Sequence, residues 1–282
     1  MSSRIFAPGL LDGQVAIVSG GGSGLGRATA LELASLGARV VVCGRRPEPL
    51  AQTAAMAGEI EARTCDIREE AEVDALVEGV LDAHGRIDTL VNNAGGQYMA
   101  PAEDINPKGF RTVIRLNVEG TWLMTHAVAT KAMMGAEGSE PRGGKIVNVT
   151  LSPHHGLPAM AHSSAARAAV ENLTRVLSIE WARFQIKLTA IAAGHFETDT
   201  LLTKYPKPVV EGMASTVPAQ RLGRPEELAW LAAFIASPAG DYLSGAVLTL
   251  DGGRDNWFGP WPPGGLADEG GKHLAEQRGP KP

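Results

Sequence analysis

Ser19-Gly20-Gly21-Gly22-Ser23-Gly24-Leu25-Gly26 is the stretch of this sequence that decides the fold. It follows an apolar run at 14–19, which has the pattern of a strand buried on both faces. From Leu25 to Leu36 apolar residues recur at helical spacing, and Gly37 ends that helix. A glycine-rich turn in this position lets the backbone approach a pyrophosphate and aims helix N–H groups at it. We favour this role over that of a purely structural turn, and the predicted nucleotide contacts are Gly20, Gly22, Ser23, Gly24, Leu25 and Gly26.

Segments with strand and helix patterns alternate along the rest of the chain. Further strands are predicted at 40–43, 87–92, 145–150, 186–192 and 246–250, and further helices at 69–84, 108–134, 161–184 and 225–236. This alternation predicts an α/β fold, a Rossmann-type, doubly wound parallel sheet of about seven strands with helices on both faces. We expect residues 1–253 to form one dinucleotide-binding domain. After Gly253 the composition shifts to Gly, Pro, Trp and charge, so 254–282 is expected to be a tail that wraps the surface as a loop.

The composition argues against several classes of protein. Hydrophobic residues make up 44% of the 282 residues, enough for a large core, and the net charge of −5 comes without a basic block. We therefore expect neither a nucleic acid nor an anionic membrane as the main partner. No apolar stretch reaches membrane-spanning length, and the start lacks the pattern of a secretory signal, which favours a cytoplasmic location. Cys43 and Cys65 lie in apolar strand-like runs, so we predict reduced core thiols, and we expect no metal site.

The end of the second predicted strand determines which dinucleotide is bound. NAD-binding proteins of this fold carry an acidic residue there that holds the ribose hydroxyls, but this chain has Gly44-Arg45-Arg46. Guanidinium groups match the oxygens of a phosphate, so Arg45 and Arg46 predict a clamp for the 2′-phosphate of NADP(H). Two solvated arginines at a loop edge are the alternative.

Three motifs resemble those of the short-chain dehydrogenase/reductase superfamily. The glycine-rich stretch matches its TGxxxGxG, Asn92-Asn93-Ala94-Gly95 matches its NNAG, and Asp251-Gly252-Gly253 matches the acidic-Gly-Gly that ends its last strand. The resemblance implies further cofactor contacts near the adenosine and the nicotinamide. These would come from Asp66, Ile67, Asn93, Ala94, Gly95, Gly194 and Thr198.

The chain departs from that superfamily where a Tyr-x-x-x-Lys pair is expected. Ser163 and Arg167 stand at the two positions. A serine hydroxyl is a far weaker acid than a phenol, and arginine does not release its proton, so simple alcohol–ketone chemistry is disfavoured. By the resemblance, Arg167 would hold the ribose of the nicotinamide. A helix residue paired with a nearby acid is the alternative.

Local stretches make the chain similar to the peroxisomal trans-2-enoyl-CoA reductases and, more distantly, to the 2,4-dienoyl-CoA reductases. They are Ala7-Pro8-Gly9-Leu10-Leu11, Asn92 to Tyr98, His162 to Arg167 and Asp255-Asn256-Trp257. Reducing a conjugated thioester develops negative charge on the thioester oxygen as an enolate, which needs positioned hydrogen-bond donors. Thr150, at the position of the superfamily's catalytic serine, is one predicted donor, and Ser152 and Ser163 are the others. Asn117 is implied to order a water chain near the site.

The α-carbon of the enolate must then gain a proton, and the sequence offers several acids. Tyr98 follows the NNAG motif in a loop that normally borders the substrate, and packing against the acyl chain is its alternative role. His154 and His155 lie on the loop after Thr150, where a solvated histidine is more common than a catalytic one. The less favoured candidates are His162, at the start of a helix, and Glu119 and His195.

Three functions agree with this pattern. The first and favoured one is an NADPH-dependent reductase of enoyl-CoA or dienoyl-CoA thioesters. The second is a hydroxyacyl-CoA or alcohol dehydrogenase with another acid–base group, such as Tyr98, and the third is an NADP-binding protein without turnover. The resemblance implies a homotetramer. The tail aromatics Trp257, Phe258 and Trp261 would cover an acyl or CoA group, or seal a subunit contact.

Overall fold

A seven-stranded, all-parallel sheet lies at the centre of the protein, with the strand order β3-β2-β1-β4-β5-β6-β7. The computed structural model describes residues 3–135, 138–204 and 206–257. The strands are β1 (Val15–Ser19), β2 (Arg39–Gly44), β3 (Ile60–Thr64), β4 (Thr89–Asn92), β5 (Gly144–Leu151), β6 (Ile186–Ala193) and β7 (Val247–Leu250). This topology confirms the predicted doubly wound sheet. The strand order reverses between β1 and β4, and ligands bind at such a reversal, outside the carboxyl ends of the strands.

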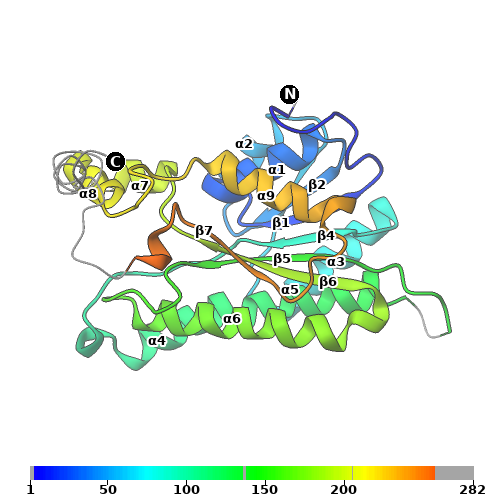
Figure 1. Cartoon of the computed structure of the whole chain (residues 1–282). Coiled ribbons are helices and arrows are strands. Elements are labelled where there is room, and N and C mark those ends of the chain that lie inside the picture. The colour runs from blue at the N-terminus through cyan, green and yellow to red at the C-terminus, as the bar shows by residue number, and fades with distance from the viewer. Residues whose placement is uncertain (1–2, 136–137, 205, 258–282) are drawn as a thin grey trace, which may run out of the picture.

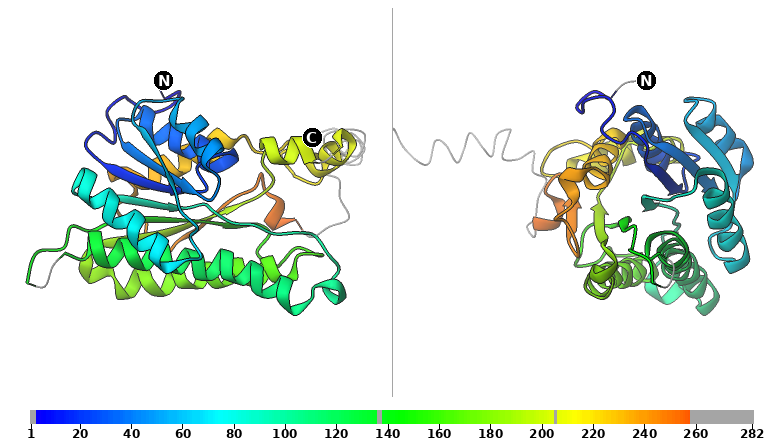
Figure 2. Two further views of the ribbon diagram at one scale, coloured as in Figure 1. Left: turned by 180° about the vertical axis from the view of Figure 1, so that it is seen from behind. Right: turned by 90° about the vertical axis from the view of Figure 1, so that its right-hand side faces the viewer.

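Helices cover both faces of the sheet (Figure 1). They are α1 (Gly24–Ser35), α2 (Pro47–Ala54), α3 (Glu70–His84), α4 (Pro107–Ile114), α5 (Gly120–Val128), α6 (Ala161–Glu180), α7 (Asp199–Lys204), α8 (Lys207–Ser215) and α9 (Pro225–Ala236). One layer contains α1, α2 and α9, and the other contains α3, α5 and α6. Figure 2 shows α7 and α8 extending beyond one end of the sheet, on the side of α9.

The two layers bury separate cores, and the strands serve both. In β1, Ile17 belongs to the core under α3 and α5, whereas the next residue, Val18, belongs to the core under α1 and α9. Leu90 and Val91 of β4 divide in the same way. Successive side chains of a strand point to opposite faces, so strands covered on both faces need a continuous apolar run. Burial of β1 on both faces, as predicted, therefore explains the apolar pattern at 14–19.

The predicted helix at 108–134 is one helical run that contains two π-helical stretches. α4 passes into η2 (Arg115–Glu119), and α5 passes into η3 (Ala129–Met133). Within η2, Nδ2 of Asn117 donates to the carbonyl of Val113 at 2.8 Å. In a regular α-helix that carbonyl accepts from the backbone N–H of residue 117, so the side chain takes the place of the helical bond.

Several elements have no strong sequence pattern. In β3 only Ile60 is buried, Glu61 and Arg63 are partly exposed, and Ala62 and Thr64 are exposed, because β3 is an edge strand. α2, α7 and α8 are short, and two of them begin at or next to a proline. Of the predicted tail, η6 (Arg254–Asn256) forms one helical turn. Phe258 and Trp261 lie outside the described residues, and the division at 253 stays a prediction.

Candidate functional site

A cavity of about 320 Å³ opens at the carboxyl ends of β1, β2 and β4, where the strand order reverses. Most of the predicted cofactor residues line it. They are Gly20, Gly22, Ser23, Gly24, Leu25, Arg45, Arg46, Asp66, Ile67, Asn93, Ala94, Gly95 and Thr198. The cavity is also lined by Cys43 and Cys65, which are free and buried, as predicted.

Gly26 and Gly194 do not line the cavity but allow close packing beside it. A Cβ on Gly26 would overlap the carbonyl oxygen of Gly20 and the side chain of Asn93, so this glycine lets α1 approach the turn. A Cβ on Gly194 would lie 2.6 Å from that of Asp251. In the described structure these two glycines therefore affect the predicted cofactor site only indirectly, through close packing beside the cavity.

The turn before α1 has the features of a phosphate site. Gly20 and Gly24 have φ values of +67° and +52°, which favour glycine. Ser23, the N-cap residue, makes no side-chain cap, and the first turn of α1 has no acidic residue. The first N–H groups of α1 therefore keep their capacity to donate to an anion, and the helix dipole favours negative charge there. These residues fit the pyrophosphate of a dinucleotide.

Two arginines and one aspartate line the cavity just after the ends of β2 and β3. Arg45 and Arg46 are exposed, and neither forms an ion pair within the part of the chain that the structure describes. Asp66 accepts from Nε of Arg68 at 2.9 Å. This bond, assisted by the nearby charge of Arg45, holds the pKa of Asp66 below its usual value, despite partial burial. Arg68 thus neutralises Asp66, and the two arginines remain as the excess positive charge.

Arg167 connects α6 to the cofactor cavity. Its Nη1 donates to the carbonyl of Val149 at 2.8 Å, and its Nη2 overlaps the place that a Cβ of Gly95 would take. Its Nε is buried without a hydrogen-bond partner, and burial lowers the pKa of Arg167 to about 10. Among the described residues Arg167 has no acidic partner, which disfavours the alternative of a helix residue paired with a nearby acid. A charged guanidinium thus lies beside a lining residue of the cavity.

The hydroxyl groups of the three predicted enolate donors each donate a hydrogen bond to a protein acceptor. Thr150 donates to Oε1 of Glu171 at 3.0 Å. Ser152 donates to the carboxylate of Asp251. Ser163 donates to Oε1 of Gln97 at 2.7 Å. A hydroxyl has one proton, so each of these bonds must reorganise before the hydroxyl can donate to a substrate oxygen. Their role as donors stays a prediction.

Asn117 fixes the loop that follows β4. Its Nδ2 donates to the carbonyl of Gly96 at 2.8 Å, and its Oδ1 accepts from the N–H of Gly96 at 3.2 Å. Asn117 is fully buried. The described contacts give it a positioning role between η2 and this loop, and the predicted water chain stays a prediction.

Tyr98 lies at the edge of the candidate site. The residue is 40% exposed, and its hydroxyl packs against Gly109 of α4. Its ring lies edge-on to the ring of His162, with 4.4 Å between the ring centroids. His162 is buried, and its Nδ1 accepts from the N–H of Ser163 at 2.8 Å. Glu119 is exposed and lies 4.0 Å from Arg115, which agrees with a solvated helix charge.

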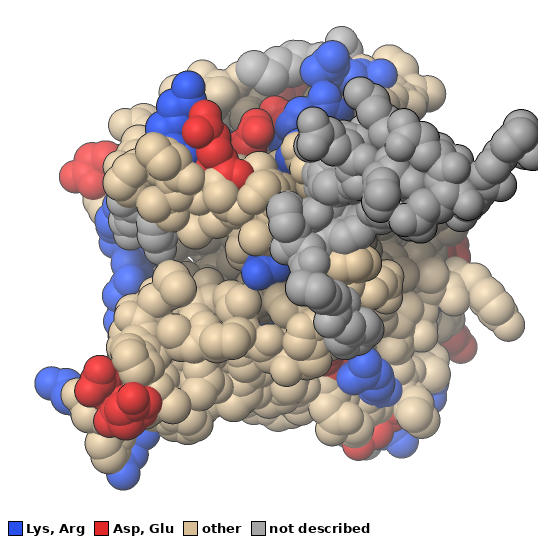
Figure 3. Space-filling model, turned by 60° about the vertical axis from the view of Figure 1, so that its left-hand side comes forward, with Lys and Arg blue, Asp and Glu red and all other residues tan. Residues whose placement is uncertain are grey.

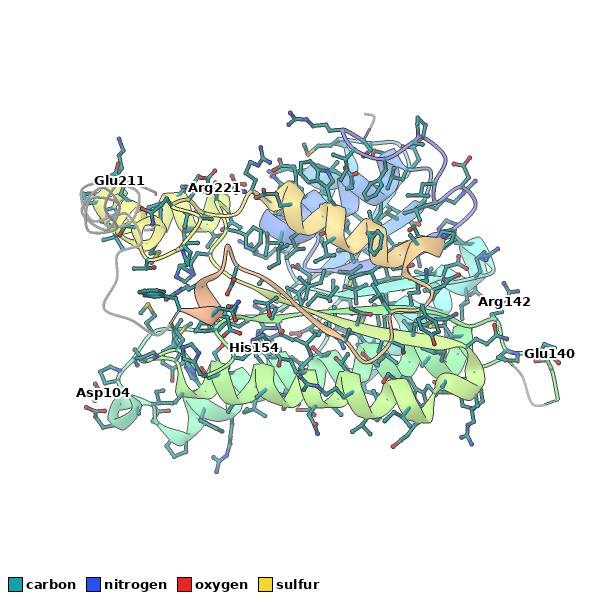
Figure 4. The ribbon with its side chains drawn as sticks, in the orientation of Figure 1. Asp104, Glu140, Arg142, His154, Glu211 and Arg221 are labelled. Carbon is teal, nitrogen blue, oxygen red and sulfur yellow. The ribbon has the colours of Figure 1, made fainter. Side chains whose placement is uncertain are left out.

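His154 and two acids form a cluster that the motifs do not contain as a unit. Nδ1 of His154 lies 2.6 Å from Oδ2 of Asp255, and its Nε2 lies 3.4 Å from Oε1 of Glu171. Figure 4 shows His154 between α6 and the segment that follows β7. Glu171 was not predicted, although it comes four residues after Arg167 and so shares its helix face. This spacing of four residues from Arg167 is the sequence signal that could have indicated Glu171.

His195 is held neutral by its surroundings. Nη1 of Arg254 lies 2.6 Å from its Nε2, and burial together with the charge of Arg254 lowers the pKa of His195 to about 4. In the unfolded chain the group titrates near 6.5. Below that pH the unfolded state binds a proton that the folded state does not, so stability is lost as pH falls from 6.5 toward 4.

We expect His195→Gln to remove part of this acid sensitivity. Between pH 7 and pH 5 the wild type should lose about 2 kcal/mol more unfolding free energy than the variant, measured by urea denaturation. His126→Gln is the matched control, because His126 is exposed on α5 beside the ring of Trp122. Equal losses in the wild type and in His195→Gln would contradict the neutral, buried state of His195.

A second hollow lies next to the cluster, between the loop after β5 and η6. It is lined by Pro153, His155, Gly156, Leu157, Pro158, Ala161, Ser164, Thr216, Arg254 and Trp257. Most of these side chains are uncharged. Figure 3 shows a neighbouring face of the molecule, which also has a hollow that is bordered largely by uncharged residues. Such a lining suits an apolar ligand with a polar group.

No helix among the described residues has both the length and the apolar character needed to cross a membrane.

Comparison with known proteins relates the chain to reductases. Residues 20–255 match a family described as Enoyl-(Acyl carrier protein) reductase. A probable 2,4-dienoyl-CoA reductase of Bacillus subtilis (strain 168) is 35% identical over an alignment of 261 residues that covers 89% of this chain and all of the relative. A peroxisomal 2,4-dienoyl-CoA reductase of Arabidopsis thaliana is 32% identical, over 88% of this chain and 86% of the relative. The solved structure of the citronellol catabolism dehydrogenase AtuB of Pseudomonas aeruginosa PAO1 is 40% identical, with a TM-score of 0.78 over 89% of this chain and 98% of that one.

Proposed function

Because the chain belongs to the short-chain dehydrogenase/reductase superfamily and is related to 2,4-dienoyl-CoA reductases, we propose that it is an NADPH-dependent reductase of conjugated thioesters. The substrate would be an enoyl-CoA or dienoyl-CoA, reduced at a carbon–carbon double bond. The observation that carries this proposal is the pair Ser163 and Arg167, in place of the phenol and amine that alcohol–ketone chemistry uses. The hydroxyl of Ser163 donates a hydrogen bond to Gln97, and Arg167 keeps its positive charge.

The chemistry of the residues supports this reaction. NADPH, when bound, supplies the hydride. Arg167 would hold the ribose with its Nη2 beside Gly95, while Val149 fixes its Nη1. A conjugated thioester that accepts hydride places negative charge on its carbonyl oxygen and requires no phenol to protonate that oxygen. Thr150 and Ser152 lie at the end of β5, where they would face this oxygen once their hydroxyls reorganise.

Turnover of defined substrates tests the proposal. We expect NADPH consumption with trans-2-enoyl-CoA or 2,4-dienoyl-CoA esters of at least one chain length, with loss of the conjugated chromophore. Similarity to the citronellol catabolism dehydrogenase AtuB favours branched, terpenoid-derived thioesters as a second substrate class, so these belong in the same panel. No turnover with any conjugated ester, with NADPH still bound in calorimetry, would favour an NADP-binding protein without turnover.

The alternative of a hydroxyacyl-CoA or alcohol dehydrogenase depends on Tyr98. The hydroxyl of Tyr98 packs against Gly109, and its ring packs on His162, which supports a packing role for this side chain. Oxidation of hydroxyacyl substrates by NADP that is abolished in Tyr98→Phe would favour the dehydrogenase. We retain a homotetramer and a cytoplasmic location as predictions, although several relatives are named peroxisomal enzymes.

We expect Arg45→Ala/Arg46→Ala to reduce the preference for NADPH over NADH. Each guanidinium would form charge-assisted hydrogen bonds worth at least about 1.5 kcal/mol, so the loss of both should lower the ratio of the two kcat/KM values by about 100-fold or more. Arg39→Ala is the matched control, because Arg39 is an exposed residue at the opposite end of β2. A double variant with an unchanged ratio would exclude the 2′-phosphate clamp.

A further inference from the structure

We propose that His154, placed between Glu171 and Asp255, is the acid that supplies the proton consumed by the reduction. The proton would reach the substrate through Glu171 and the hydroxyl of Thr150. This inference rests on the proposed reductase function and names the proton source that this function requires.

The contacts of Glu171 make the path continuous. One oxygen atom, Oε1, accepts from the hydroxyl of Thr150 at 3.0 Å and lies 3.4 Å from Nε2 of His154. Glu171 is 9% exposed, so its carboxylate has little contact with solvent. The shared oxygen is therefore a point of transfer between the imidazole and the hydroxyl.

Asp255 orients the imidazole for this transfer. Its Oδ1 accepts from the N–H of His154, and its Oδ2 lies 2.6 Å from Nδ1 of the same residue. Burial disfavours the charged form of Asp255, but the hydrogen bonds from the ring and backbone of His154 outweigh it and hold the pKa of this carboxyl below its usual value. With both ring nitrogens protonated, His154 donates to Asp255 on one side and faces Glu171 with the other.

The other two hydroxyls at the site do not lead to an acid of this kind. Ser163 donates to the amide of Gln97, which does not titrate. Ser152 donates to Asp251, whose oxygens accept from the backbone N–H groups of Gly253, Arg254 and Asp255. Backbone amides are not acids, so this path ends at Asp251. Within the described structure, only the path from Thr150 reaches a histidine.

Exposure completes the arrangement. The side chain of His154 is 29% exposed, so it can regain a proton from water after each turnover. Glu171 and Thr150 are buried, so a direct exchange between them and water is restricted. The charged and titratable groups around His154 are Glu171 and Arg175 on α6, Asp251, Arg254 and Asp255 after β7, and His155 on its own loop.

The step balances without a further reactant. Hydride addition converts the conjugated thioester to an enolate, and the displaced electron pair rests on the thioester oxygen. His154 passes its Nε2 proton to Oε1 of Glu171, which reverses the hydrogen bond to Thr150. Thr150 then gives its own proton to the carbon of the enolate and takes the proton of Glu171. The carbon–hydrogen bond forms with the returning electron pair, and His154 is left neutral until water reprotonates it.

The test compares kcat, its pH profile and its solvent isotope effect in the wild type and in His154→Gln. We expect kcat of the variant to fall about 100-fold, within the usual range for loss of a general acid. The wild type should lose activity as His154 deprotonates with rising pH, and the variant should lack this dependence. Because proton delivery becomes slower, the kinetic effect of D₂O should increase, while the Kd of NADPH stays unchanged.

Two further variants separate the possible outcomes. Glu171→Gln should lower kcat although it leaves His154 in place, and His126→Gln, on exposed α5 surface, should behave as the wild type. A wild type that reduces conjugated thioesters while His154→Gln keeps its kcat and pH profile would overturn the role of His154 alone. A wild type that reduces none of them would overturn the proposed function and this inference together.

Discussion

Arg167→Met should lower kcat/KM of the reduction about 100-fold and weaken NADPH binding measured by calorimetry. The variant removes a buried charge that lies beside Gly95 of the cofactor cavity and is fixed by the carbonyl of Val149. Hydrogen bonds to charged groups are worth about 1.5–3 kcal/mol each, and one such bond to the ribose accounts for most of the expected loss. Methionine keeps much of the apolar contact of the arginine stem, so folding should be preserved.

Arg142→Met is the matched control for that variant. Arg142 is exposed and lies far from His154, toward the opposite end of the molecule (Figure 4). Its replacement should leave NADPH binding and kcat/KM unchanged. An Arg167→Met protein that binds NADPH as tightly as the wild type would contradict the role of Arg167 as a holder of the ribose.

Gly26→Ala should have the second large effect, because a single methyl group has no space there. The new Cβ would overlap the carbonyl oxygen of Gly20 and the side-chain amide of Asn93. The first of these is backbone, so the glycine-rich turn itself must move. Overpacking of this kind costs about 1–3 kcal/mol, and the moved turn should weaken NADPH binding at least as much.

Gly58→Ala tests whether the effect belongs to the site or to glycine in general. A Cβ on Gly58 meets no atom within 4 Å, and its φ lies outside the left-handed region. This substitution should leave the unfolding free energy within about 1 kcal/mol of the wild type and the Kd of NADPH unchanged. Similar losses in both variants, measured by urea denaturation and calorimetry, would refute the close-packing explanation.

The fold could be predicted because its signals are local. A buried strand, a glycine-rich turn and an amphipathic helix follow one another within 14–37, and each is determined by neighbours in the sequence. β3 escaped prediction because it lies at the edge of the sheet, where charged residues such as Glu61 and Arg63 interrupt the apolar pattern of a strand. The lining residues of the cofactor cavity were predictable for the same reason as the fold, since they sit at the ends of strands that the pattern identifies.

The candidate acid cluster could not be predicted from spacing, because its members come together only through the fold. His154 meets Glu171 from α6 and Asp255 from the segment after β7, and the aspartate lies 101 positions away along the chain. The sequence alone offers His154 as one acid among several, without a partner. The same holds for the three hydroxyls, whose acceptors were unknown until the side chains were in place.

The residues of the dinucleotide cavity, which lies at the reversal of strand order between β1 and β4, are largely separate along the chain from those of the proposed proton path. Residues that line the dinucleotide cavity come mostly from the first third of the chain, whereas Thr150, His154, Glu171 and Asp255 all come later. On the proposed function, we therefore expect changes after β5 to alter the substrate that is accepted while the glycine-rich turn is kept, provided that Arg167 and Thr198 are retained. Chimeras joined within β5 that keep these two residues would test this expectation.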